Sequence, residues 1–405
     1  MRFCTILALV AAVTSTVTAG WVTVVDAVPT PVINRSTSKR FGVLGGFETG
    51  NAIADDYGML HLFYGEKTGN TTYPWKMGWT DRIGHWTSTD GGLNWSRLET
   101  VMAKASLWSS MPFFDASDGR WKLFYCNESV GDTRTAVAAN KGRDSIRSAQ
   151  NWTFPTCGHD CPPSVHPSIN TYSISNPFRP NGLGGNFTVF LDHGGLFEVM
   201  LAQSRDIAGP FELMAANNSA TQLFPESPAK YPGNVTTPRA WIENPIVAAV
   251  ANGFVATWDY VQGGGEKKGT PLPYLGFSWS RDGLSWPANQ SALVPVKTSA
   301  SAEAWTDLVR TPTGLLPDPS GKEGRFKLFY AARDTRLVQA PYTNCSVNPH
   351  HPRIGGAPPP PPPGWEDGCY WGIGSLTVEI ALPKLHKEQA PAVEGDWNGG
   401  LARAQ

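Results

Sequence analysis

Short apolar and aromatic runs recur along the chain, each placed directly after a turn rich in Gly, Asp or Asn. The five clearest runs are residues 59–64, 121–125, 187–191, 254–258 and 326–330. Aromatic and β-branched runs bounded by turn residues are typical of β-hairpins, and almost no stretch shows the 3.6-residue period of a helix. The pattern therefore predicts five similar units built from short strands.

A second pattern, Ser-x-Asp followed by Gly and then an aromatic residue, comes after these hairpins. The clear copies are 88–95 and 280–286, a variant is 204–211, and 144–152 is interpreted as a degenerate copy. The Asp accepts hydrogen bonds from turn N–H groups, the Gly supplies positive φ, and the aromatic residue packs the turn onto its sheet. We expect these boxes to be structural and not catalytic.

Five units of ~45–75 residues fit an all-β fold, the five-bladed β-propeller. The predicted blades lie near 42–100, 101–153, 170–215, 238–290 and 303–383. Residues 21–28 alternate between apolar and polar and are expected to add an outer strand that closes the ring. A β-sandwich is the alternative, but it would not repeat a three-part unit five times.

The propeller domain is predicted over 20–383, with an insertion in the last blade and a polar tail after it. The insertion, 336–368, contains six consecutive prolines at 358–363, and the tail is 384–405. A proline run forms an extended polyproline II helix and cannot pair in a sheet. We expect a loop on the last blade; a ligand for a protein partner is the alternative.

The N-terminus predicts secretion. Arg2 precedes an apolar stretch, 3–13, and small and polar residues then lead to Ala19, as in a secretory signal peptide of residues 1–19. A buried N-terminal strand or helix is the alternative. Removal of Cys4 with this peptide leaves an odd number of cysteines: Cys126, Cys157, Cys161, Cys345 and Cys369. At most two disulfides can form among them, and Cys157–Cys161 and Cys345–Cys369 are the pairings considered.

Glycosylation sequons support the same compartment. Ten Asn residues begin an N-x-S/T without Pro: Asn34, Asn70, Asn94, Asn127, Asn151, Asn186, Asn217, Asn234, Asn289 and Asn344. Random placement would give about three. No second apolar stretch is long enough to span a membrane. We therefore expect a soluble, N-glycosylated, extracellular protein that is a monomer.

Composition excludes several classes of protein. The 405 residues carry 33 Lys and Arg against 34 Asp and Glu, a formal charge of −1, so the strong positive field of a nucleic-acid binder is absent. At 41% hydrophobic residues, disorder of the whole chain is not expected. The G-x-S-x-G elbow, the P-loop, the H-E-x-x-H zinc motif and the dinucleotide fingerprint are all absent.

The first strand of four units carries a short motif of its own. These motifs are Trp-Ser-Ser-Met-Pro at 108–112, Ile-Ser-Asn-Pro at 174–177, Trp-Ile-Glu-Asn-Pro at 241–245 and Val-Arg-Thr-Pro at 309–312. They resemble the five-bladed arabinanase, levansucrase and invertase superfamily, and most of all glycoside hydrolase family 43. That family has W-A-P on blade two, I-D-P on blade three and, on blade four, E-G-P, whose Glu is the general acid.

The resemblance implies a glycosidase that uses two carboxylates, with an inverting mechanism. Glu243 matches the acid of the E-G-P motif, and its apolar neighbours Trp241 and Ile242 would raise its pKa. The structural alternative is that Glu243 pairs with Arg239 or Arg310.

The base is less well defined by sequence, because blade one has no D-P motif. Glu48 is the nearest carboxylate to that position, and Asp307 is a reserve candidate. Asn176 stands where the family has an ionisable Asp. Asp55 and Asp56 are assigned to the first hairpin turn as turn formers.

Trp108, Trp241 and Trp305 are candidates to stack on sugar rings, although Trp residues that hold blades together are commoner. Asn176, Asp307 and Arg310 complete the predicted substrate contacts. No cofactor is required by this chemistry, although some relatives hold a Ca²⁺ ion in the central channel.

Two classes of function remain open. The first is a secreted glycoside hydrolase acting on a pentose- or hexose-containing polysaccharide. The second is an inactive propeller that binds glycans or a protein partner at the same funnel, which Asn176 and the missing D-P motif favour. A sialidase shares the Asp boxes, but it needs six blades and three Arg residues that grip a carboxylate.

Overall fold

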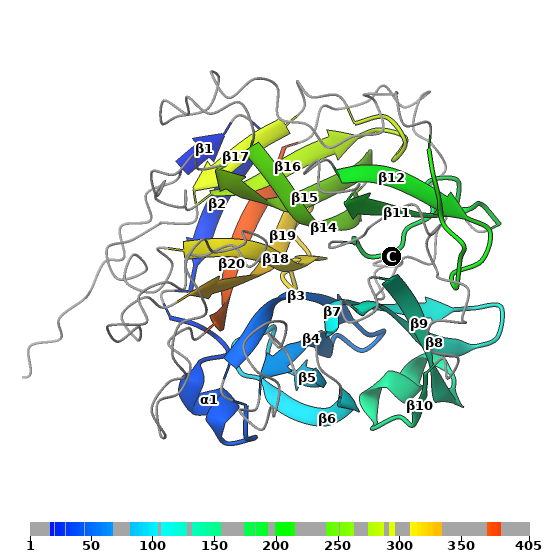
Figure 1. Ribbon diagram of the computed structural model, residues 1–405. Coiled ribbons are helices and arrows are strands. Elements are labelled where there is room, and N and C mark those ends of the chain that lie inside the picture. Colours follow the sequence, from blue (N-terminus) through cyan, green and yellow to red (C-terminus); the bar gives the residue numbers. More distant parts are fainter. Residues whose placement is uncertain are drawn as a thin grey trace, which may run out of the picture.

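The computed structural model describes the greater part of the chain. The described residues are 17–19, 21–28, 30–43, 45–67, 82–103, 107–127, 132–154, 174–182, 184–192, 199–214, 240–250, 252–262, 274–286, 291–295, 308–333 and 371–381. Within them, the chain forms five separate antiparallel sheets arranged as the blades of a propeller (Figure 1). The predicted fold class, an all-β five-bladed propeller, is confirmed.

Each predicted unit corresponds to one sheet. Blade 1 consists of β3 (Gly45–Ala54), β4 (Leu60–Lys67), β5 (Arg82–Ser88) and β6 (Ser96–Ala103). Blade 2 consists of β7 (Leu107–Asp115), β8 (Arg120–Asn127), β9 (Asp132–Lys141) and β10 (Trp152–Thr153). Blade 3 consists of β11 (Phe187–Asp192), β12 (Val199–Ser204) and β13 (Glu212–Leu213), and its first strand is reduced to two isolated bridges, Ile174 with Leu191 and Phe178 with Thr188.

The last two blades complete the ring. Blade 4 consists of β14 (Ala240–Val250), β15 (Gly253–Gln262), β16 (Tyr274–Ser280) and β17 (Ser291–Pro295). Blade 5 consists of β18 (Leu308–Pro317), β19 (Arg325–Arg333), β20 (Trp371–Ile380), β2 (Val22–Ala27) and β1 (Val17–Ala19). The helical elements among the described residues are α1 (Arg35–Lys39) and the 3-10 helix η1 (Arg143–Arg147).

The ring is closed by the N-terminal part of the chain. β2 pairs antiparallel with β20, so that one end of the propeller sequence supplies the outer part of the last blade. This confirms the outer strand predicted for 21–28. β1, which pairs with β2, lies before the predicted cleavage point at Ala19, so cleavage there would remove β1 and keep the closing strand.

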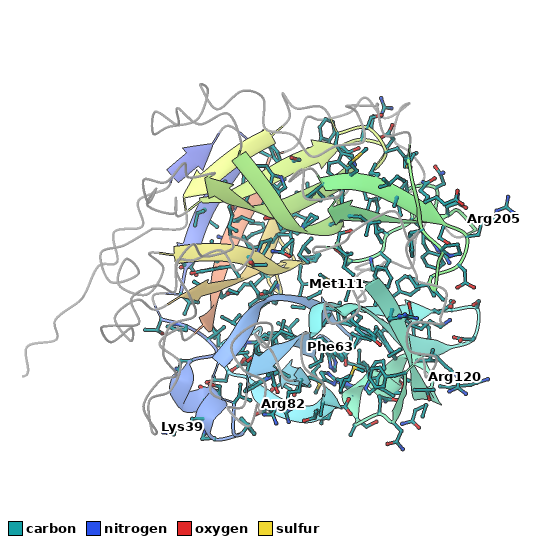
Figure 2. The ribbon with its side chains drawn as sticks, in the orientation of Figure 1. Lys39, Phe63, Arg82, Met111, Arg120 and Arg205 are labelled. Atoms are coloured by element: carbon teal, nitrogen blue, oxygen red, sulfur yellow. The ribbon has the colours of Figure 1, made fainter. Side chains whose placement is uncertain are left out.

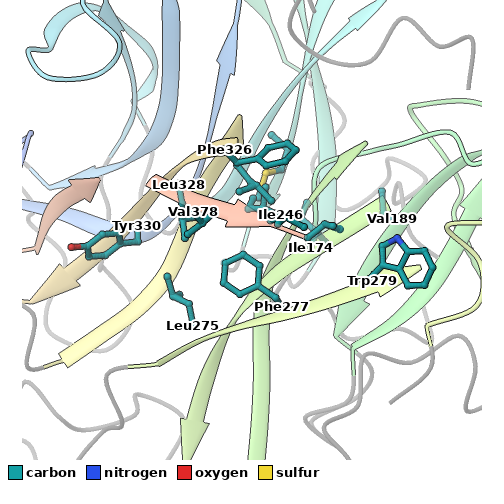
Figure 3. Close-up of a cluster of buried hydrophobic side chains, with 14 of the residues drawn as sticks. Ile174, Val189, Ile246, Leu275, Phe277, Trp279, Phe326, Leu328, Tyr330 and Val378 are labelled. Carbon is teal, nitrogen blue, oxygen red and sulfur yellow. The ribbon is translucent and has the colours of Figure 1, made fainter. Parts of the chain in front are cut away.

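Aromatic side chains pack the blades against one another. The rings of Trp95 and Phe329 meet edge to face at 5.5 Å between blades 1 and 5, and Phe113 meets Phe187 at 5.0 Å between blades 2 and 3. Figure 3 shows the largest buried cluster, where Val189 of blade 3, Phe277 of blade 4 and residues of blade 5 converge. Burial of apolar and aromatic surface between the sheets is the dominant favourable contribution to the free energy of folding.

Polar and apolar side chains separate as the strand pattern requires. In Figure 2 the buried Phe63 and Met111 lie inside the propeller, whereas Lys39 and Arg205 lie at its periphery. Alternation along half-buried strands, with large aromatic residues on the faces that meet the next blade, explains this separation. None of the helices in the described ranges is long and apolar enough to cross a membrane.

The Asp boxes have the structural role expected of them. The Ser88 hydroxyl accepts from Gly92 N at 3.0 Å, Asp90 accepts from Leu93 N at 3.0 Å, and Trp95 Nε1 donates to Gly92 O at 3.0 Å. The box at 280–286 repeats these bonds, with Ser280, Asp282, Gly283 and Trp286 in the same places. Although burial acts in the opposite direction, the hydrogen bonds keep the pKa of Asp90 below its usual value.

The interpretation of 144–152 as a degenerate Asp box is wrong. Residues 143–147 form η1, and the exposed Asp144 accepts from the Tyr57 hydroxyl at 3.2 Å across the interface with blade 1. The Asp144 carboxylate thus contacts a side chain of blade 1, whereas an Asp-box carboxylate accepts from the N–H groups of its own turn. The spacing between Asp144 and Trp152 resembles that of an Asp box, but the local backbone is different.

Candidate functional site

The first strands of four blades are interrupted near their starts. The register shifts between Gly46 and Gly50 in β3, between Trp108 and Met111 in β7, between Glu243 and Ile246 in β14, and between Val309 and Thr311 in β18. A β-bulge bends its strand and redirects its side chains, and bulges are common beside active sites. All four interruptions fall in or beside the stretches that the sequence singled out.

These interrupted strands surround the propeller axis. β3 contacts β7 and β18, and β18 contacts β14, so the first strands of neighbouring blades face each other. Because every blade repeats the same antiparallel order, its first strand begins at one end of the propeller, which we call the motif end. The turns after the first and third strands then lie at the opposite end.

Five predicted site residues lie near the beginnings of these strands. The backbone places Glu48 on β3, Trp108 on β7, Trp241 and Glu243 on β14, and Arg310 on β18. Their side chains, and the whole of Asp307 and Trp305, lie outside the described part of the structure. The topology therefore brings the two candidate carboxylates to the motif end, and β18, which carries Arg310, lies between their strands.

Asn244 gives the blade-four motif an unusual backbone. Its φ is 50°, the only positive φ of a non-glycine residue in the described ranges, and it is 4% exposed. Asn tolerates this left-handed region better than most residues, whereas glycine adopts it without cost. The backbone directly after Glu243 thus favours Asn or Gly.

The register also reveals an acidic position that sequence reasoning missed. Asp259 on β15 pairs directly with Glu243 on β14. Residues at directly opposite positions of antiparallel strands share one face of the sheet. Only the hairpin register, which depends on the bulge at Asn244, could have identified this pair.

Asn176 is held between two blades. Its Nδ2 donates to Val247 O at 2.8 Å, and its Oδ1 accepts from Val247 N at 2.7 Å, with the side chain buried. Both ends of the amide therefore bind the backbone of β14 in blade 4. Its predicted contact with substrate stays a prediction, while the structure gives the side chain a clear structural role.

The buried acids whose side chains the structure describes are all paired with cations. Glu66, fully buried on β4, accepts from Arg82 Nε at 2.6 Å, Arg97 Nη2 at 2.9 Å and Trp86 Nε1 at 2.6 Å. Asp115 accepts from Lys122 Nζ at 2.6 Å. Such compensation makes a buried carboxylate structural, because its charge and lone pairs are already used.

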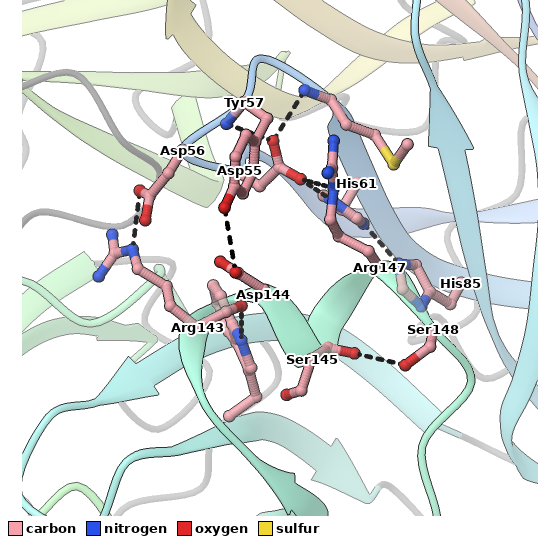
Figure 4. A network of polar contacts seen from close by, with 12 residues as sticks. Asp55, Asp56, Tyr57, His61, His85, Arg143, Asp144, Ser145, Arg147 and Ser148 are labelled. Carbon is pink, nitrogen blue, oxygen red and sulfur yellow. Dashed lines mark hydrogen bonds and ion pairs between the residues drawn. The ribbon is translucent and has the colours of Figure 1, made fainter.

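Asp55 confirms its predicted role in the first hairpin turn and has a further one. Its Oδ1 accepts from Tyr57 N and Met59 N, both at 2.9 Å, and its Oδ2 lies 2.6 Å from Arg147 Nε of blade 2. Figure 4 shows this contact beside the pair formed by Asp56 and Arg143. The turn of blade 1 is thereby joined to η1 of blade 2 at the end opposite the motifs.

Other predicted features fall on residues that the structure does not describe. These are Cys157, Cys161, Cys345 and Cys369, the proline-rich insertion at 336–368 and the tail at 384–405. The disulfide pairings therefore stay predictions. Within the described ranges, no group of three or more His, Cys, Asp and Glu residues could hold a metal ion.

No protein-family model and no curated protein matches this chain. The solved structures similar to it include a thermostable family-43 glycoside hydrolase, with 10% identity, a TM-score of 0.45, and 71% of this chain and 84% of that chain covered. A glycosyl hydrolase from Bacteroides ovatus has 14% identity and a TM-score of 0.47, with 84% and 87% covered. A family 117 glycoside hydrolase from Zobellia galactanivorans has 14% identity and a TM-score of 0.47, with 86% and 96% covered. At these values, the likeness identifies no functional residue of this chain.

Proposed function

We propose that the protein is a secreted glycoside hydrolase whose general acid is Glu243. The observation that carries the proposal is the positive φ of Asn244. The related motif E-G-P has glycine at this place, and a left-handed backbone is what glycine and Asn share. The backbone thus supports the correspondence of Glu-Asn-Pro with E-G-P, and with it the role of Glu243.

The chemistry needs an acid and a base on either side of the scissile bond. An acid protonates the leaving oxygen, and a carboxylate about 6.5–9.5 Å away activates water in an inverting enzyme. The strands that carry Glu243 and Glu48 are separated by β18. Because these strands belong to blades that are not adjacent, Glu48 is our candidate base, and Arg310 on the strand between them is a candidate substrate contact.

The proposed substrate is a pentose- or hexose-containing polysaccharide, and Trp108 and Trp241, near the beginnings of β7 and β14, are the residues proposed to stack on sugar rings. The test is hydrolysis of aryl arabinosides, xylosides and galactosides, and of arabinan and xylan, by the mature protein and by Glu243→Gln. We expect turnover of at least one substrate class, and on arabinan or xylan a reduction of about 10²–10⁴-fold in the variant. Full activity of the variant on the polysaccharide would remove Glu243 from the mechanism.

A binding function is the second candidate, and Asn176 is the observation that favours it. The family's ionisable residue is replaced here by an amide that is bonded to Val247 at both ends. An inactive propeller predicts glycan binding by calorimetry that persists in Glu48→Gln and Glu243→Gln, together with no turnover of any substrate. Loss of binding in both variants would argue against it.

A further inference from the structure

Three sequons place an Asn in solvent beside an anchored aromatic residue. Asn94, Asn151 and Asn186 are exposed, and they precede Trp95, Trp152 and Phe187 in turn. Trp95 and Phe187 are buried, and Trp152 is partly buried and packs against the core of blades 1 and 2. At each position the aromatic ring faces the protein while the Asn that precedes it remains accessible.

All three lie at the same end of the propeller. Asn94 lies in the turn between β5 and β6, and Asn151 lies between β9 and β10, so each follows the third strand of its blade. Asn186 lies in the turn before β11, after the reduced first strand of blade 3. Turns after first and third strands are at the end opposite the motif end.

Other sequons differ from these three. Asn34 is half-buried, and its Oδ1 caps α1 by accepting from Thr37 N at 2.9 Å. Asn127 is the last residue of β8, at the motif end, and its side chain lies outside the described part. The exposed, described sequons are therefore confined to the end that faces away from Glu48 and Glu243.

We propose that N-linked glycans on Asn94, Asn151 and Asn186 cover the end of the propeller opposite the candidate site. The proposal rests on the predicted entry of the chain into the secretory route and not on glycosidase activity. A bond forms between each Asn Nδ2 and the anomeric carbon of a diphosphate-activated oligosaccharide. The diphosphate leaves with the bonding electrons, and one amide proton is released.

The local hydrogen bonds are compatible with this modification. Asn94 Nδ2 donates to Asp90 Oδ2 at 2.7 Å, and a glycosylated amide keeps one N–H that can still donate. At Asn186 the sequon hydroxyl belongs to Thr188, which is fully buried and accepts from Gln203 Nε2 at 3.1 Å. Transfer to Asn186 must therefore precede the folding of blade 3.

The test uses the full chain expressed with its own N-terminal segment in a eukaryotic secretory host and recovered from the medium. Peptide N-glycosidase in heavy-oxygen water converts each glycosylated Asn to labelled Asp, which peptide mass spectrometry locates. We expect the label at all three positions. Ser96→Ala, Thr153→Ala and Asn186→Gln should each remove one glycan and raise electrophoretic mobility by one step.

Two features of the variants guard against misfolding as an explanation. Ser96→Ala destroys the sequon but leaves the Asn94–Asp90 bond in place, and Asn181→Gln changes an exposed Asn of the same turn as Asn186 that is in no sequon. Asn181→Gln should leave the mobility unchanged. Label at fewer than two of the three positions, or an unglycosylated protein retained in the cell, would overturn the proposal.

Discussion

The Nδ1 atom of His61 lies 3.0 Å from the Nε2 atom of His85, and both imidazoles are fully buried in blade 1. The other nitrogens face carboxylates: His61 Nε2 lies 3.4 Å from Asp55 Oδ2, and His85 Nδ1 lies 3.2 Å from Glu99 Oε1. Three contacts in a row need three protons, but two neutral imidazoles carry only two.

The contact without a proton is the longest one, between His61 Nε2 and Asp55 Oδ2 at 3.4 Å. Asp55 already accepts from two backbone N–H groups and pairs with Arg147, so its carboxylate is stabilised without a hydrogen bond from His61. We assign the two protons to Nδ1 of His61 and Nδ1 of His85, so that His61 donates to His85 and His85 donates to Glu99. Nε2 of His61, which faces Asp55, is then unprotonated. Burial lowers the pKa of His61 to about 4, and the charge of His85 acts in the same direction. Burial also lowers the pKa of His85; Glu99 acts against this shift, and the charge of Arg97 acts with it.

This pair should make the fold sensitive to acid. Because the pKa of His61 is lower in the folded than in the unfolded chain, the unfolded chain binds the proton first, and stability falls as pH falls from about 6.5 to about 4. The loss from His61 is about 3 kcal/mol. Urea unfolding across this range should show a smaller loss for His61→Gln than for the native chain.

The control for this measurement is Asp56→Asn, which removes an exposed carboxylate of the neighbouring turn. Its pH dependence should follow that of the native chain, since exposed ion pairs contribute little. Equal pH dependence of His61→Gln and the native chain would show that His61 is not the titrating group.

Asn176→Asp tests the joint between blades 3 and 4. The new carboxylate cannot donate to Val247 O, so an oxygen would face the carbonyl at the present 2.8 Å. We expect the free energy of unfolding to fall by about 1–3 kcal/mol. Asn181→Asp, an exposed change in the same blade, should cost less than about 0.5 kcal/mol. Equal stability of the two variants in urea would contradict the bidentate contact.

Two substitutions of Asn244 that both remove its amide side chain differ from each other in backbone preference. Asn244→Gly keeps the left-handed conformation available, whereas Asn244→Ala makes it cost about 1 kcal/mol more. If this bulge positions Glu243, kcat should fall more in the Ala variant than in the Gly variant, with KM less affected. Similar kcat values in the two variants would separate the bulge from catalysis.

Asp259→Asn tests the acidic pair found from the hairpin register. The backbone position of Asp259 pairs with that of Glu243, so removing this carboxylate should move the alkaline limb of the pH profile of kcat/KM to lower pH if the two carboxylates interact. Asp206→Asn, in the Asp-box variant of blade 3, is the matched control and should leave the limb in place. An unmoved limb in Asp259→Asn would show that the two carboxylates do not interact.

The sequence predicted those parts of the fold that depend on local pattern. The aromatic hairpins, the boxes around Trp95 and Trp286 and the closing strand β2 are encoded by consecutive residues, so each could be identified alone. The contact of Asn176 with Val247 could not be predicted, because the two residues are 71 positions apart and meet only when neighbouring blades pack.

The site was predicted less completely for a similar reason. Glu243 became a candidate because its motif is contiguous, whereas Asp259 became a candidate only through the register on either side of a bulge. Asp144 was misassigned because the spacing of residues resembled a box while the backbone formed η1. The spacing of residues in the sequence does not show whether the backbone forms an Asp-box turn or a short helix.

The central claim, that Glu243 is the general acid, is tested most directly by comparing leaving groups. A general acid matters most when the departing oxygen is strongly basic, and little when it leaves without protonation. We predict that Glu243→Gln loses about 10²–10⁴-fold in kcat/KM on alkyl glycosides or polysaccharide but retains near-native activity on the matching dinitrophenyl glycoside. An equal loss on both substrates would contradict the assignment of Glu243 as the acid.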